Sequence, residues 1–115
     1  MRLLNVFAAL SGLIALVMLV LAAHALQPVP EDLQRIQLGA FIQLGAAGAG
    51  LALSNRSGRL NLIAGAMILI GAAVFAGTLY SLAITHSRAL VMLAPIGGIT
   101  LILGWFALLF TKPNA

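Results

Sequence analysis

The chain has 115 residues, of which 63% are hydrophobic and 7% charged, and its formal net charge is +4. Soluble globular domains carry about 25% charged residues, so this composition and a mean hydropathy of +1.15 exclude that class and indicate a membrane protein. The few Lys and Arg stand singly, which argues against nucleic acid as a partner, and the absence of cysteine excludes disulfides and thiolate chemistry.

Four apolar stretches predict an all-α integral membrane protein, an antiparallel four-helix transmembrane bundle that forms a single domain over residues 1–115. Each stretch approaches or exceeds the roughly 20 residues that cross a bilayer. The predicted helices cover residues 3–25, 30–53, 60–84 and 89–110. The first resembles a secretory signal with an Ala23-His24-Ala25 cleavage site, but its apolar run is longer than the roughly 15 residues of such signals. We interpret it as an uncleaved first span.

Small residues inside these stretches predict where helices pack, because they let two helix backbones approach closely. The pairs Gly45/Ala49 and Ala46/Gly50 indicate that the second helix lies at the centre of the bundle. The predicted packing residues are Gly45, Ala46, Ala49, Gly50, Ala73, Gly77, Gly97 and Gly98.

Pro95 lies two turns inside the fourth predicted helix. There it would remove a backbone donor, free the carbonyl of Val91 and kink the helix, and Gly97-Gly98 would loosen it further.

The positions of Lys and Arg predict the orientation of the bundle, since cytoplasmic loops carry an excess of both. Four spans put Arg2, Arg56, Arg59 and Lys112 on one side and Arg35 and Arg88 on the other. We therefore expect a multi-pass protein of the bacterial inner (plasma) membrane with both termini cytoplasmic.

The opposite side collects the polar residues that offer chemistry. His24 and His86 fall there near Glu31 and Asp32, and the two imidazoles have room to meet. Their spacing is not that of a metal motif, and histidines near a helix end are usually solvated or bonded to the backbone, so we predict no metal. Tyr80 and Arg88 lie on the same side, and Tyr80 is expected to be an interfacial anchor.

Gln43 lies within the apolar part of the second helix. An unpaired amide is costly in hydrocarbon, so we expect it to find a partner across the bundle or at a protein interface. His24, Gln43, Tyr80, His86 and Arg88 are the possible functional polar residues. No nucleophile elbow or phosphate-binding loop is present, so the sequence predicts no catalytic residue, no cofactor and no enzymatic activity.

Several short motifs occur in an order and spacing that resemble one family. They are Leu21-Ala22-Ala23-His24-Ala25-Leu26, Gly77-Thr78-Leu79-Tyr80, His86, Pro95-Ile96-Gly97-Gly98 and Gly104-Trp105. The sequence is similar to the domain of unknown function 423 family, the YgdD-like small membrane proteins. The second helix departs from the family pattern, which has Tyr and His at the positions of Leu38 and Ile42. The resemblance implies a four-span bundle and no established activity.

Two functional hypotheses follow from the sequence. The first is a structural or accessory subunit that contacts membrane lipid and packs with itself, as a homo-oligomer, or with a larger membrane protein complex. It rests on the small-residue faces and on the lack of charge within the spans. The alternative is a channel or small-solute transporter that uses a helix break at Pro95-Ile96-Gly97-Gly98 to expose backbone carbonyls.

Overall fold

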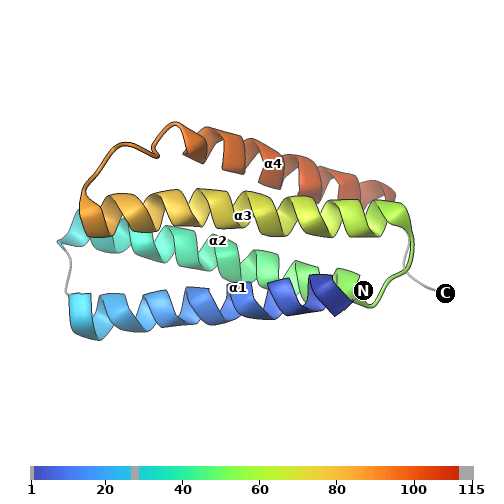
Figure 1. Ribbon diagram of the computed structural model, residues 1–115, viewed down its shortest axis with the longest axis horizontal. Coiled ribbons are helices and arrows are strands. Elements are labelled where there is room, and N and C mark those ends of the chain that lie inside the picture. The colour runs from blue at the N-terminus through green and yellow to red at the C-terminus, as the bar shows by residue number, and fades with distance from the viewer. Residues whose placement is uncertain (1, 27–28, 112–115) are drawn as a thin grey trace.

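The structure, a computed structural model, describes residues 2–26 and 29–111 as four antiparallel helices (Figure 1). Helix α1 spans Arg2–Leu21 and continues into a π-helical turn, Ala22–Leu26. Helices α2 and α3 span Pro30–Ser54 and Arg59–Thr85, and α4 spans Leu93–Ala107 before a 3-10 turn, Leu108–Phe110. Counted with the turns that continue α1 and α4, all four are long and apolar enough to cross a membrane. The bundle is 48 Å long, close to the roughly 40–45 Å of a bilayer with its headgroups.

The ends of the central helices follow from local sequence chemistry. Pro30 is the first residue of α2, where a missing N–H costs nothing, and the carbonyl of Val29 accepts the N–H of Leu33 at 2.9 Å. Helix α3 ends at His86, whose left-handed backbone (φ 59°) lets its N–H donate to the carbonyl of Leu82 at 2.9 Å. His86 is thereby turned back toward the bundle end.

Helix α2 lies between α1 and α3, and α4 packs chiefly against α3 (Figure 1). The prediction that the second helix is central is therefore confirmed. Alanine supplies much of the core, and the fully buried alanines are Ala8, Ala15, Ala40, Ala64 and Ala76. Because lipid tails are as apolar as leucine, such close contact between small residues is what holds membrane helices together.

Glycines form the seam between α3 and α4. A Cβ at Gly97 would lie 2.7 Å from the backbone nitrogen of Phe75, and a Cβ at Gly71 would lie 2.7 Å from that of Leu101. A Cβ at Gly104 would come within 2.8 Å of Ile68. Only glycine permits this approach of two helix backbones. Gly98 lies beside the seam, where an added Cβ would make only ordinary contact with Phe75, at 3.8 Å.

The predicted start and kink of the fourth helix are wrong. Residues 89–92 form turns, and α4 begins at Leu93. Pro95 therefore lies in the first turn, where the backbone N–H groups have no partner within the helix in any case. The carbonyl of Val91 is not freed by the proline either, since it accepts the N–H of Ala94 at 3.2 Å.

The packing faces of α2 and α3 differ in part from the prediction. Gly50 is buried, and a Cβ there would lie 2.9 Å from that of Ala8, while Ala46 is buried as well and Ala49 partly so. Gly45 and Gly77 face outward, and an added Cβ would meet nothing within 4 Å at either position. Ala73, one turn before Gly77, is also exposed. Neither Gly45 nor Gly77 packs against another helix of this chain.

Candidate functional site

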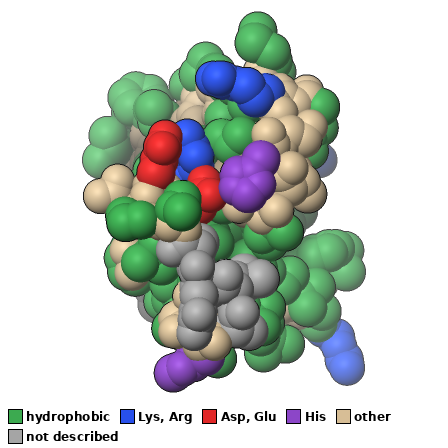
Figure 2. All heavy atoms as spheres, turned by 90° about the vertical axis from the view of Figure 1, so that its left-hand side faces the viewer, with side chains coloured by type: hydrophobic (Ala, Val, Ile, Leu, Met, Phe, Trp, Pro, Cys, Tyr) green, Lys and Arg blue, Asp and Glu red, His purple; other side chains and the backbone are tan. Residues whose placement is uncertain are grey.

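Charged side chains meet at the end of the bundle where α2 begins and α3 ends (Figure 2). Asp32 is the buried member of this cluster, with a side chain only 5% exposed. Its Oδ1 accepts a hydrogen bond from Arg35 Nη1 at 2.8 Å, and its Oδ2 lies 2.8 Å from His86 Nε2. Arg35 also donates from Nη2 to Glu31 at 2.8 Å. One carboxylate thus joins the start of α2 to the end of α3.

The helix geometry explains why this cluster forms. Glu31, Asp32 and Arg35 share a face because they stand three and four positions apart on α2. The acidic pair also complements the positive dipole at the start of the helix. His86 reaches Asp32 from α3 because of its left-handed backbone. An ionised carboxylate only accepts, so Nε2 of His86 carries the hydrogen of that bond.

The two histidines remain separate on this end of the molecule (Figure 2). His24 is exposed on the π-helical turn that follows α1. Within residues 2–26 and 29–111, no group of three or more His, Asp and Glu side chains is placed to hold a metal ion. Arg88 is exposed in the segment between α3 and α4, where its carbonyl accepts the N–H of Val91.

Gln43 has a partner across the bundle, as its position predicts, and that partner is Tyr80. The Tyr80 hydroxyl donates to Gln43 Oε1 at 2.8 Å, and both residues are buried, at 8% and 4% exposed. The ring of Tyr80 lies against Gly39, where an added Cβ would be 3.1 Å from Cε1. Tyr80 is therefore a buried link between α3 and α2, and its predicted role as an interfacial anchor is wrong.

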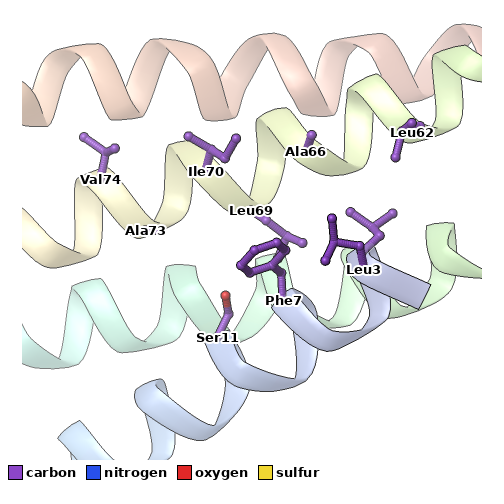
Figure 3. A pocket seen from close by; sticks show the side chains of 10 residues that line it. Leu3, Phe7, Ser11, Leu62, Ala66, Leu69, Ile70, Ala73 and Val74 are labelled. Atoms are coloured by element: carbon purple, nitrogen blue, oxygen red, sulfur yellow. The ribbon is translucent and has the colours of Figure 1, made fainter. Parts of the chain in front are cut away.

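A third feature is an open apolar groove of about 400 Å³ between α1 and α3 (Figure 3). Its walls come from the first half of α1 and from the stretch of α3 between residues 62 and 74. Ser11 on α1 is the one residue with a polar side chain among those that line it. No residue of the segment Pro95-Ile96-Gly97-Gly98 lines this groove, so it lies away from the helix break on which the transport alternative depends.

Sequence reasoning missed two of these features. It placed His86 and Asp32 on one side and left room for His86 to meet His24, but it did not predict the bond between His86 and Asp32, because nothing in the sequence marks a left-handed residue at the end of α3. It did not single out Ser11 or the groove, because a groove depends on the angle between α1 and α3, which composition does not specify.

The family model described as Protein of unknown function (DUF423) matches residues 20–98 of the chain. The UPF0382 inner membrane protein YgdD of Escherichia coli K12 is 30% identical over 114 residues, which cover 94% of this chain and 87% of the relative. A UPF0382 membrane protein of Haemophilus influenzae is 35% identical over 110 residues, covering 89% of this chain and 86% of that protein.

A more local match joins the chain to the UPF0382 membrane protein SH2409 of Staphylococcus haemolyticus. It is 42% identical over 48 residues, which cover 42% of this chain and 39% of the relative. No solved structure matches the chain.

Proposed function

The chain belongs to the family described as Protein of unknown function (DUF423), whose relatives include inner membrane proteins, and we propose that it is a structural or accessory subunit. In this role it packs with itself or with a larger membrane protein complex. The observation that carries the proposal is the outward face of α2, where Gly45 and Gly48 are exposed and an added Cβ would meet nothing within 4 Å.

Glycine in a helix costs about 0.5 to 1 kcal/mol relative to alanine, so it is usually offset by close packing. No packing within residues 2–26 and 29–111 explains Gly45 or Gly48. They stand three positions apart, and Ala52 follows one turn later on the same exposed face. A helix of another protein, or of a second copy, can approach the backbone of α2 along this line.

The polar groups favour a structural role over transport or catalysis. Tyr80 and Gln43 bond to each other inside the bundle, and Asp32 is bonded to both Arg35 and His86. Pro95 in the first turn of α4 opens no helix at mid-membrane depth. These contacts support the assignment of no enzymatic activity and no transport path to the chain.

We also propose the inner membrane as its location, with both termini in the cytoplasm. The described arginines Arg2, Arg56 and Arg59 lie at the end of the bundle that holds the N-terminus, and Lys112 falls outside the described residues. At the other end, Arg35 is paired with two carboxylates and Arg88 stands apart from them. The excess of positive charge therefore lies with the N-terminus.

The test is the mass of the purified full-length protein in mild detergent. The parent should run as a homo-oligomer or with a co-purifying membrane protein. The double variant Gly45→Leu/Gly48→Leu should shift to the monomer, because the leucines hold the partner helix away. Ile102→Leu places the same side chain on α4, at a position that is 67% exposed and already bulky, and should leave the assembly intact. A monomeric parent with no co-purifying partner would overturn the proposal.

A further inference from the structure

The groove between α1 and α3 has the direction and depth of one membrane leaflet. Leu62, Ala66 and Ile70 line it at four-residue intervals along α3, so it runs parallel to the helix axes. From Leu62 to Val74 the helix rises roughly 18 Å at 1.5 Å per residue. The hydrocarbon core of a bilayer is about 30 Å thick, so one leaflet contributes about half of that. The groove thus extends from one membrane surface to about the bilayer midplane.

The walls of the groove are apolar along its length. Phe7 and Leu3 face it from α1, opposite the aliphatic side chains of α3 (Figure 3). Its volume of about 400 Å³ is small for a further transmembrane helix, whose diameter with side chains is about 10–12 Å. The shape suits a single flexible hydrocarbon chain.

The mouth of the groove carries two arginines. Arg2 directly precedes the lining residue Leu3, and Arg59 stands three positions before Leu62, on the same face of α3. Both are exposed, and within the described part of the chain the side chain of neither has a hydrogen bond or ion pair. The two acidic residues of the sequence, Glu31 and Asp32, lie at the opposite end of the bundle. No acidic side chain therefore lies beside the two arginines at the mouth.

We propose that this groove holds an acyl chain of an anionic phospholipid, whose headgroup phosphate is bound by Arg2 and Arg59. Guanidinium groups bind phosphate through paired hydrogen bonds, and basic pockets between membrane helices are known sites for anionic headgroups. Ser11 places a hydroxyl beside the inner part of the chain. The inference is independent of the proposed oligomer, because the groove and the outward glycines of α2 involve different surfaces.

The experiment is native mass spectrometry of the delipidated full-length protein, titrated with phosphatidylglycerol or with phosphatidylcholine of identical acyl chains. The parent should bind one phosphatidylglycerol more tightly than phosphatidylcholine. Each of Arg2→Gln and Arg59→Gln should weaken phosphatidylglycerol binding about fivefold, as expected for one surface cation. Arg88→Gln, at the other end of the bundle, is the matched control and should leave it unchanged.

Two variants test the groove itself. Ala66→Phe fills its middle and should reduce the binding of both lipids. Ala73→Phe fills its inner part from an exposed position, so it should do the same without disturbing the fold. Equal binding of the two lipids by the parent, parental phosphatidylglycerol binding by the double arginine variant, or unchanged binding by a folded groove variant would each overturn the proposal. A polypeptide retained at the groove in place of lipid would overturn it as well.

Discussion

Tyr80 and Gln43 form a hydrogen bond of 2.8 Å that joins α3 to α2 inside the bundle. Both side chains are buried, so neither has water as an alternative partner. In hydrocarbon an unsatisfied amide is costly, and interhelical hydrogen bonds of this kind fix which faces of two helices meet. The bond accounts for the polar residue in the apolar part of α2.

Tyr80→Phe removes the donor and leaves the Gln43 carbonyl without its partner. We expect a loss of stability of about 0.5 to 2 kcal/mol, measured as thermal or denaturant-induced unfolding in detergent. Gln43→Leu combined with Tyr80→Phe should recover part of the loss, because no buried amide remains. If Tyr80→Phe alone were as stable as the parent, the bond would have no structural role.

Gly97→Ala and Gly77→Ala form a matched pair, because Gly97 is packed between two helices and Gly77 lies on an exposed helix surface. Gly97→Ala places a methyl group 2.7 Å from the backbone nitrogen of Phe75, so α3 and α4 must separate, at a cost of about 1 to 3 kcal/mol. Gly77→Ala meets open space and should leave stability unchanged or raise it by up to about 1 kcal/mol. The same unfolding measurement compares the two. Equal losses at both sites would contradict the arrangement of α3 and α4.

Asp32→Ala removes the carboxylate that joins Arg35 and His86. We expect the segment from His86 to Met92 to exchange its amide hydrogens faster, because the end of α3 loses its contact with α2. Glu31→Ala is the control, since the Glu31 side chain is 75% exposed and, among the described residues, bonds only Arg35. Unchanged exchange in Asp32→Ala would show that the segment is held by other contacts.

The proposed orientation can be read with single cysteines, because the natural chain has none. Ser87→Cys lies in the exposed segment between α3 and α4, and Ser57→Cys lies in the turn between α2 and α3. A membrane-impermeant thiol reagent added to intact spheroplasts should label the first and not the second. The reverse pattern would place both termini outside the cytoplasm.

The sequence predicts both ends of α2 and the start of α3, because Pro30 and the polar turn at residues 54–59 interrupt the apolar runs. The start of α4 could not be predicted from the sequence, because residues 89–94 are nearly as apolar as the helix that follows. Its true start depends on Pro95, which is tolerated in a first turn and destabilising one turn later.

The choice of packing face was harder to predict. Residues 45–50 of α2 are all glycine or alanine, so the sequence offers no period that distinguishes the inward Gly50 from the outward Gly45. The neighbouring helices decide it, since Leu69 of α3 and Ala8 of α1 close around Gly50. For the candidate site, the sequence predicted that the acidic residues and the histidines lie at the same end of the bundle, and that Gln43 has a partner. It could not identify Tyr80 as that partner, because tyrosine near a helix end also fits an interfacial position.

The central claim is that the outward face of α2 contacts another protein in the membrane. Its most direct test is photocrosslinking in native membranes with a photoreactive residue at position 48, and with position 102 on α4 as control. Ile102 is 67% exposed and carries a bulky side chain, which keeps a partner helix away from the backbone of α4 at this position. Crosslinks to a second copy or to another membrane protein from position 48, with few from position 102, are the predicted result. Adducts to lipid alone from position 48 would contradict the claim.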